Sequence, residues 1–362
     1  MSFSAGPVLS FLVNLYGDAY NPADATTKLG VPVKLTHYVE HDKDKDSQFE
    51  RASVEAVYQQ IVKDLKASVE YFDQSPQTHS FYRASKEAAL LLLSRVYLYM
   101  QDWQAARQVA GDFLKIKPDL QNLGGLVQDS SRVVIAEENP EIVFSQGSLN
   151  VQNAFTGEGG DLCISGDLYQ SYDSVDYRKQ VYFTRSLQSD SIGLWRKYKT
   201  GVHRSYVSDL FMIRSAEGYL NMAEACAMTD DAAGASEWLN KLREYRIGDY
   251  KNQTYNVEEA REQVRLERRR ELCIEGHRWF DLRRYAVCQK APFKKPIDRI
   301  YALYDYDNRS IFKYAERYRL EVDDPAYTFA IPKSVLEFDL GMPDNFRPKR
   351  EYTNLIFGFV TQ

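Results

Sequence analysis

Charged side chains recur at steps of three or four residues along the segment 258–286. The series consists of Arg268, Glu271, Glu275, Arg278, Asp281 and Arg284. On a helix, this spacing places neighbouring side chains on one stripe, where guanidinium groups and carboxylates can form ion pairs. An adjoining apolar stripe contains Trp279, Leu282, Tyr285 and Ala286. Gly276 interrupts the helical run and is expected to mark a kink or a close backbone approach.

Three interpretations of this segment compete. A solvated charged helix explains residues 261–270 but not the aromatic pair Trp279-Phe280 beside the charges. A nucleic-acid-binding helix is disfavoured, because eight arginines between Arg261 and Arg284 are accompanied by five acidic residues, which leaves a net charge of only +3. We favour a structural charge network, in which arginine forks hold carboxylates where the helix docks on its neighbours. The segment is then a determinant of the fold rather than a catalytic site.

The composition of the 362-residue chain is that of a soluble globular protein, with 44% hydrophobic and 27% charged residues. Its net charge of −5 argues against nucleic acid or an anionic membrane surface as a partner. Aromatic residues make up 13% of the chain. Rings in such numbers serve a core, an interface or a sugar-stacking surface, and composition alone does not choose among these.

Motifs for catalysis, cofactors and metals are missing from the sequence. There is no HExxH, P-loop, GxSxG or GxGxxG motif. The cysteines, Cys163, Cys226, Cys273 and Cys288, form no CxxC, and the second and third are expected to be buried hydrophobes inside helices. His37 and His41 are four residues apart, but their segment has no helical pattern. We therefore predict no metal site and no cofactor.

Two pairs of antiparallel helices are predicted, related by a shift of 129 residues. Ser53 is the expected N-cap of a helix through Phe72, and Ser85 starts a helix to Met100 that is followed by a second helix through Lys117. The shift aligns Ser94 with Ala223, Tyr97 with Cys226, Ala106 with Ala235 and Phe113 with Leu242. Small residues at such positions let two helices approach closely, as in tetratricopeptide-like pairs.

The segment 121–208 differs from the helical regions on either side. Helical periodicity disappears, glycines and aromatic residues become more frequent, and residues 141–145 have the pattern of a short strand. We predict a mainly α protein with one domain over 1–362. Its parts are the first helical pairs at 50–120, a loop-rich, aromatic insertion at 121–208, the second helical pairs and the charged helix at 209–290, and an irregular C-terminal segment at 291–362.

The charged segment resembles the C-terminal signature of the SusD/RagB family of nutrient-binding outer-membrane lipoproteins from Bacteroidetes-type bacteria. The matching string is Arg265-x-x-Arg268-x-x-Glu271-Leu272-x-x-Glu275-Gly276-x-Arg278-x-x-Asp281-Leu282-x-Arg284. Further landmarks occur in family order from about Leu12 to Pro348, among them Leu15-Tyr-Gly-Asp18, Ala84-Ser-Lys-Glu-Ala88, Arg214-x-Ala216-Glu217 and Ile331-Pro332. The resemblance implies a SusD-like superhelix of tetratricopeptide-like helical pairs, with the insertion as its ligand face.

The resemblance also implies a function. A protein of this family binds an oligosaccharide or another nutrient at the cell surface, without catalysis, and delivers it to a SusC-like TonB-dependent outer-membrane transporter. The membrane is reached only through an N-terminal lipid anchor. This chain has no signal peptide and no cysteine before Cys163, so we expect a chain that lacks its leader and the first segment of the family.

A sugar ring has apolar faces and a rim of hydroxyl groups, so its site needs flat aromatic side chains and a few polar groups. The insertion supplies both. Our candidate ligand-binding residues are Asn153, Phe155, Tyr172, Tyr177, Tyr182, Arg185 and Trp195. The alternative is that these rings fill the core of the insertion itself. Two further pairs, Asp176-x-Arg178 and Lys197-Tyr198, resemble family positions that we interpret as structural.

Two other classes of function stay open. One is a helical-repeat scaffold that binds only protein or peptide and has no sugar site. The other is a glycoside-active enzyme built on a helical scaffold, because pairs of carboxylates for glycoside hydrolysis occur in any chain with 51 acidic residues.

Overall fold

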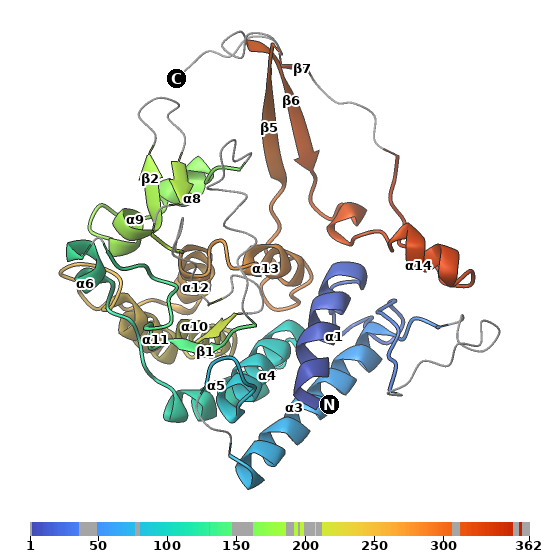
Figure 1. Cartoon of the computed structure of the whole chain (residues 1–362), viewed down its shortest axis with the longest axis horizontal. Helices are drawn as coiled ribbons and strands as arrows, with labels where there is room; N and C mark the ends of the chain where they lie inside the picture. The colour runs from blue at the N-terminus through green and yellow to red at the C-terminus, as the bar shows by residue number, and fades with distance from the viewer. Residues whose placement is uncertain are drawn as a thin grey trace. The chain divides into compact units, whose positions relative to one another are not determined.

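The structure is a computed structural model of the chain. It describes residues 2–35, 49–76, 80–129, 131–146, 162–185, 192–194, 196–198, 207, 212–305, 312–349 and 355–356. Helices predominate, as predicted (Figure 1). The chain divides into two compact units: a helical unit, Met1–Ser10 with Tyr58–Phe280, and a terminal unit, Phe11–Val57 with Asp281–Gln362. Among the described helices, none combines the length and the hydrophobicity that a membrane span requires.

Two helix pairs form the scaffold of the helical unit, as the internal repeat predicts. The first pair consists of α4 (Lys86–Met100) and α5 (Trp103–Ile116), and the second of α10 (Ser215–Met228) and α11 (Ala232–Arg243). Helix α10 packs against α4, α5, α11 and α12 (Val257–Glu271). Every residue of α10 is buried, which makes it the central helix of this scaffold. Helix α3 (Val54–Gln74) precedes the first pair.

The turns inside the two pairs have the same construction. Asp102 caps α5 and Asp231 caps α11, each by accepting a backbone N–H from the first turn of its helix. The preceding residues, Gln101 and Asp230, have left-handed φ angles of 62° and 63°. Since each position recurs after 129 residues, the structure confirms the repeat in backbone geometry as well as in sequence. Ser85 caps α4, as predicted.

Gly218 lies at the close approach of α10 to α5. A Cβ atom on this residue would be 2.5 Å from Cε1 and 2.7 Å from Cδ1 of Phe113, whose side chain is fully buried. Small residues are therefore needed at this helix crossing, as the sequence pattern indicates.

Gly218→Ala is expected to destabilise the protein by up to about 2 kcal/mol. The added methyl group overpacks the contact with Phe113 at a cost of about 1–3 kcal/mol, and the gain in helix propensity of about 1 kcal/mol offsets part of this cost. Thermal unfolding followed by circular dichroism measures the effect. Gly125→Ala in α6 (Leu123–Gln128) is the matched control, since its Cβ would meet no atom within 4 Å. Equal melting temperatures for the two variants would contradict the prediction.

Short elements make up the described part of the insertion. Besides α6, they are β1 (Ile142–Phe144), α8 (Gly166–Gln170), α9 (Tyr177–Tyr182), β2 (Phe183–Arg185) and β3 (Ile192–Leu194). Strand β2 pairs with β3, and β1 pairs with β4 (Ile213–Arg214), directly before α10; both pairs are antiparallel. Strand β1 confirms the strand predicted at residues 141–145.

The charged segment forms two helices rather than one. Helix α12 ends at Glu271, and α13 (His277–Ala286) follows after a turn in which Ile274 and Gly276 have φ angles of 63° and 80°. A Cβ atom on Gly276 would meet nothing within 4 Å. The glycine therefore allows the positive φ angle of the turn between the two helices, and no close approach of another segment requires it. Cys273 is buried in this turn, not within a helix as expected.

The terminal unit contains a sheet that corrects the prediction of an irregular segment at 291–362. Strands β5 (Ile297–Tyr304) and β6 (Phe312–Leu320) form an antiparallel hairpin, and β7 (Leu355–Ile356) pairs with β6. The short helices η1 (Pro325–Tyr327) and α14 (Lys333–Phe338) follow the hairpin. Bulky and charged residues alternate through most of β6, which is the strand period.

Arg51 holds together distant parts of the terminal unit. Its Nε donates to the carbonyl of Gly30 at 2.8 Å, and Nη2 donates to the carbonyl of Tyr16, the last residue of α1 (Ser2–Tyr16), at 2.8 Å. Its Nη1 donates to Oδ1 of Asn345 at 2.9 Å. The Asn345 amide donates in turn to the Tyr16 carbonyl at 2.7 Å. Segments near the two ends of the sequence are thus joined through one guanidinium group.

Candidate functional site

Glu271, at the end of α12, is the centre of a buried cluster of ion pairs in the helical unit. Its Oε1 accepts hydrogen bonds from Arg214 at 2.7 Å and from Arg246 at 2.9 Å. Its Oε2 accepts one from Arg178 at 2.9 Å and a second one from Arg246 at 2.9 Å. All four side chains are at most 2% exposed. The arginines come from the start of α9, the residue before α10 and the segment after α11, so one carboxylate joins four parts of the chain.

The cluster extends beyond Glu271, and the charges of its almost fully buried members balance; Arg270, 14% exposed, lies 3.7 Å from Glu267 at the edge of the cluster. The cations are Arg178, Lys197, Arg214, Arg243 and Arg246, and the carboxylates are Glu141, Asp176, Glu267, Glu271 and Glu275. Arg214 binds Glu275 in a bidentate pair, with both N···O distances at 2.8 Å. Such pairing and the many hydrogen bonds offset the cost of removing these charges from water.

The arginines keep the carboxylates ionised. Burial alone raises the pKa of Glu267, but Arg178 and Arg243 outweigh burial and lower this pKa to about 2. Burial likewise opposes ionisation of Glu271, and its three arginines still hold the pKa well below the usual value. A general acid or base needs a pKa near the working pH. These carboxylates are therefore suited to holding the fold together and not to proton transfer.

The structure confirms the charge-network interpretation for Glu271 and Glu275. The spacing alone predicts that their cationic partners are neighbours on the same helix. The structure shows instead that these partners belong to other elements. A pair within one helix does occur in α13, where Arg284 Nη2 lies 2.8 Å from Oδ1 of Asp281. Most ion pairs of the network thus join residues that are far apart in the sequence.

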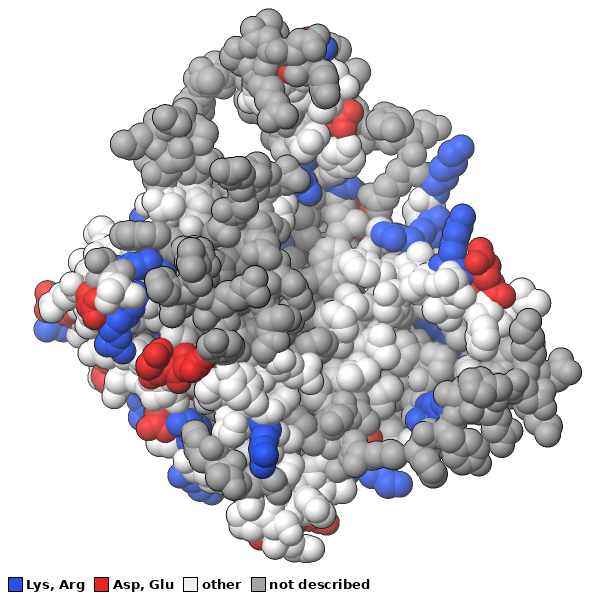
Figure 2. All heavy atoms as spheres, viewed as in Figure 1, with Lys and Arg blue, Asp and Glu red and all other residues white. Residues whose placement is uncertain are grey.

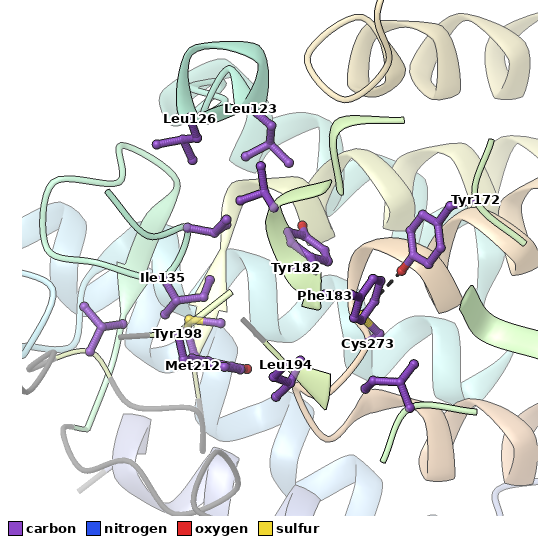
Figure 3. Close-up of a cluster of buried hydrophobic side chains, with 14 of the residues drawn as sticks. Leu123, Leu126, Ile135, Tyr172, Tyr182, Phe183, Leu194, Tyr198, Met212 and Cys273 are labelled. Atoms are coloured by element: carbon purple, nitrogen blue, oxygen red, sulfur yellow. Dashed lines mark hydrogen bonds between the residues drawn. The ribbon is translucent and has the colours of Figure 1, made fainter. Parts of the chain in front are cut away.

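A hydrophobic cluster fills the interior of the insertion (Figure 3). Its members include Leu123, Leu126, Ile135, Tyr172, Tyr182, Phe183, Leu194, Tyr198, Met212 and Cys273. They come from α6, the segment between α6 and β1, the region from α8 to β3, and the segments before β4 and after α12. The cluster lies beside the ion pairs, since Lys197 Nζ is 4.5 Å from the ring centroid of Tyr182 and pairs with Glu275 at 2.7 Å.

Tyr172 and Tyr182, two of the predicted ligand-binding residues, belong to this core. Tyr172 is 2% exposed, and its hydroxyl donates to the carbonyl of Arg270 at 2.7 Å. Tyr182 is fully buried, and both rings pack edge-on against Phe183. Burial raises the pKa of both hydroxyl groups well above the usual value. Their assignment to the ligand is corrected, because rings enclosed in this way cannot stack on a sugar; they fill the core of the insertion.

The other predicted ligand residues have different outcomes. Tyr177 is half-buried and lies against the backbone, since a Cβ atom on Gly124 would be 3.0 Å from its ring. Arg185 ends β2, and its side chain is not among the parts that the structure describes. Asn153, Phe155 and Trp195 lie outside the described residues, as do His37 and His41. These assignments stay predictions.

The two pairs interpreted as structural are confirmed as such. Arg178 is fully buried and binds Asp176 through Nε at 3.0 Å and Nη2 at 2.8 Å. Lys197 is also fully buried, and its Nζ donates to the carbonyl of Glu271 at 3.2 Å. The hydroxyl of Tyr198 donates to the carbonyl of Ile274 at 2.8 Å. The insertion is therefore fastened to the turn after α12 as well as to α12 itself.

The β5–β6 hairpin exposes aromatic side chains that were not among the predicted ligand residues. Tyr301 and Tyr318 are 43% and 53% exposed. The register places Tyr301 opposite Glu316 and Tyr318 opposite Arg299, so both rings share one face with a cation and a carboxylate. The sequence contains an aromatic run at 301–306. Because this segment was not predicted as a strand, the sequence did not indicate which of its rings lie on the same face.

Charges of both signs are mixed on the molecular face drawn in Figure 2, and its described residues form no continuous basic stripe of the kind that nucleic acid binds. Within the described ranges, no group of His, Cys, Asp and Glu side chains could hold a metal ion.

Two family models match the chain. The model described as "SusD family" matches residues 178–345, and the model described as "Starch-binding associating with outer membrane" matches residues 8–98. The first match contains most of the ion cluster, from Arg178 through Glu275, and the second contains α3 and most of α4.

Similar proteins agree with the family models. SusD-like protein P2 from Formosa agariphila is 27% identical in an alignment of 286 positions that covers 63% of this chain and 55% of that protein, so the chain spans about half the length of this relative. A solved structure of a candidate sugar-binding protein from Bacteroides vulgatus is 25% identical, with a TM-score of 0.71 over 94% of this chain and 74% of that one. A SusD superfamily protein from Bacteroides thetaiotaomicron, 22% identical, has a TM-score of 0.73 over 96% and 77% of the two chains. The fold is thus the one that the sequence predicts.

Proposed function

The chain belongs to the SusD/RagB family, and from this membership we propose that it binds an oligosaccharide without cleaving it, at the outer membrane. It would then pass the ligand to a SusC-like TonB-dependent transporter. One observation carries the proposal: a candidate sugar-binding protein of known structure is 25% identical and matches 94% of this chain. The description of the N-terminal family model, which names both starch binding and the outer membrane, supports it further.

The ligand face in this proposal is the insertion, and its contacts are Trp195, Phe155, Asn153, Arg185 and the half-buried Tyr177. Aromatic faces stack on the C–H surface of a sugar ring, and amide and guanidinium groups bind its hydroxyls. The buried core and the ion cluster hold the described part of the insertion in one conformation and so support such a face, because a preorganised site loses less conformational entropy when a ligand binds. Tyr172 and Tyr182 act in this support and not as contacts.

A binding role without catalysis agrees with the electrostatics of the helical unit. Retaining and inverting glycosidases both require a carboxylic acid that holds a proton near the working pH. Glu267 and Glu271 are kept ionised by arginines and are closed off from solvent. The pKa values of Glu267 and Glu271 are therefore lowered, whereas the general acid of a glycosidase needs a raised pKa.

Trp195→Ala is expected to abolish measurable oligosaccharide binding, because removing one stacked ring from a site of a few contacts takes away much of its binding energy. Affinity electrophoresis or calorimetry against a panel of linear glucans, mannans, galactans and xylans measures the effect, with the melting temperature recorded in parallel. Trp238→Phe is the control. Trp238, on α11, packs edge-on against Tyr219 at a centroid distance of 5.5 Å and belongs to the scaffold.

Other outcomes of the same assay would favour the other two functions. Equal glycan binding by wild type and Trp195→Ala would contradict the assignment of the insertion as the ligand face. Co-purification with a transporter without binding to any glycan would favour the helical-repeat scaffold. Release of reducing ends from the panel would show an enzyme.

A further inference from the structure

A pocket in the terminal unit lies where the chain enters and leaves the β5–β6 hairpin. Its walls are residues 18–19 after α1, residues 282–287 of α13 and its end, residues 294–295 before β5, and residues 322–328 after β6. Its volume is about 210 Å³. Sites for drug-sized ligands have ~300–1,000 Å³, so this pocket is suited to one small ring and not to a chain of rings.

Hydrogen bonds between its own walls hold the pocket open in one shape. The guanidinium of Arg283, only 4% exposed, donates from Nη2 to the carbonyl of Gly17 at 2.6 Å and to Oγ1 of Thr328 at 3.0 Å. The hydroxyl of Tyr327 donates to the carbonyl of Lys295 at 3.0 Å. Residues 282–287, 294–295 and 322–328 are thus linked by hydrogen bonds, and the bond to Gly17 links them to the residue directly before 18–19. A pocket that is preorganised in this way has a lower entropic cost of binding.

The lining combines an apolar surface with polar groups of balanced charge. The apolar part comprises Ala19, Leu282, Ala286, Val287, Val322 and Pro325. The charged part comprises Asp18, Asp323 and Asp324 with Arg283, Lys294 and Lys295. Because the three carboxylates match the three cations, the lining gives no net attraction to an anion or a cation. A neutral ligand with one apolar face and a hydroxylated edge is complementary to these walls.

We propose that this pocket binds one neutral sugar ring, as a second carbohydrate subsite distinct from the insertion. The inference rests on the proposed carbohydrate-binding function and adds a site to it. The ring places a C–H face on Leu282 and Ala286, and its hydroxyl groups donate to the carboxylate of Asp18. Lys294 and Asp323 form an ion pair at 2.6 Å, with side chains 44% and 57% exposed. Such exposed pairs are weak, so both groups can turn to sugar hydroxyls.

Saturation-transfer NMR on the full chain with D-glucose, D-galactose, D-mannose and D-xylose tests the proposal. Wild type is expected to bind at least one of them. Ala286→Trp fills the pocket with an indole and is expected to weaken that binding at least about tenfold, since the ring and the sugar cannot share ~210 Å³. Ala233→Trp, at an exposed position of α11, is the matched control and should bind like wild type.

Asp18→Asn provides a second variant that keeps the shape of the side chain. Loss of the carboxylate acceptor is expected to weaken binding roughly tenfold, and this variant decides the question if Ala286→Trp does not fold. Oligosaccharide binding that depends on Trp195, together with no binding of the four monosaccharides, would overturn the pocket and leave the proposed function intact. Monosaccharide binding unchanged in Ala286→Trp or in Asp18→Asn would also overturn it. If no saccharide of either size binds, the proposed function itself fails.

Discussion

Glu271→Ala is expected to lower the free energy of unfolding by about 3–5 kcal/mol, because it leaves three buried guanidinium groups without their shared carboxylate. Arg178, Arg214 and Arg246 all donate to Glu271 and are fully or almost fully buried. Each retains other partners, but the positive charge at the centre of the cluster is no longer offset. Since a domain is stable by only about 5–15 kcal/mol, the variant should melt far below wild type or fail to fold. Thermal and urea unfolding followed by circular dichroism measure the loss.

Glu262→Ala is the matched control for this prediction. Glu262 lies on the same helix and is exposed, so its removal should change the free energy of unfolding by less than about 0.5 kcal/mol. Similar unfolding curves for the two variants would show that the buried network does not stabilise the fold. A binding-deficient Glu271→Ala protein of unchanged stability would instead move the charged segment from the scaffold to the ligand site.

Features that depend on local sequence could be predicted. The helix pairs follow from spacing, caps and small residues. Asp102 and Asp231 occupy equivalent positions because each turn needs a side chain that accepts a backbone N–H at the start of the second helix. Of the two roles predicted for Gly276, the structure shows the break in the helix and no close backbone approach. The structural role of Asp176 and Arg178 was also predicted, although only by resemblance and not from the residues.

Features that depend on distant partners could not be predicted from one sequence. The spacing of Glu271 and Glu275 shows that they share a helical stripe, but it does not identify Arg214, which lies 57 residues before Glu271 in the chain. Tyr172 and Tyr182 have the composition of a sugar site, yet the same rings suit a core, and only three-dimensional packing decides between the two. The hairpin was missed because β5 does not alternate clearly, although β6 does.

The ion cluster connects the stability of the scaffold with the proposed ligand face. Arg178 belongs to the insertion, while Glu267 and Glu271 belong to α12, so their ion pairs at 2.5 Å and 2.9 Å fasten one to the other. Lys197 and Glu275 make a second connection of the same kind. If the insertion is the ligand face, as proposed, the charged segment would affect binding indirectly, by holding the described part of the insertion against α12.

Acidification is expected to destabilise the helical unit as the pH falls from about 4.5 towards 2. Burial raises the pKa of Glu217 and Glu267, but Arg95 acts on the first and Arg178 on the second, and each pKa is lowered from 4.5 to about 2. A carboxyl with a lowered folded-state pKa contributes stability that is complete above its unfolded pKa and is lost as the pH falls through the folded value. Each of the two therefore contributes on the order of 3 kcal/mol at neutral pH.

Urea unfolding of wild type and Glu267→Gln across this pH range tests the acid dependence for one carboxyl. Glutamine cannot ionise, so the variant is expected to be less stable than wild type at neutral pH, with a gap that narrows as Glu267 itself becomes protonated in the wild type. Glu262→Gln, exposed on the same helix, should show almost no gap at any pH. The contrary result is a difference in the free energy of unfolding between wild type and Glu267→Gln that stays constant from neutral pH to about pH 2. The contacts of Glu267 with Arg178 and Arg243 would then stabilise the fold equally whether or not Glu267 is ionised. The ion cluster would then stabilise the fold through shape and hydrogen bonding rather than through electrostatics.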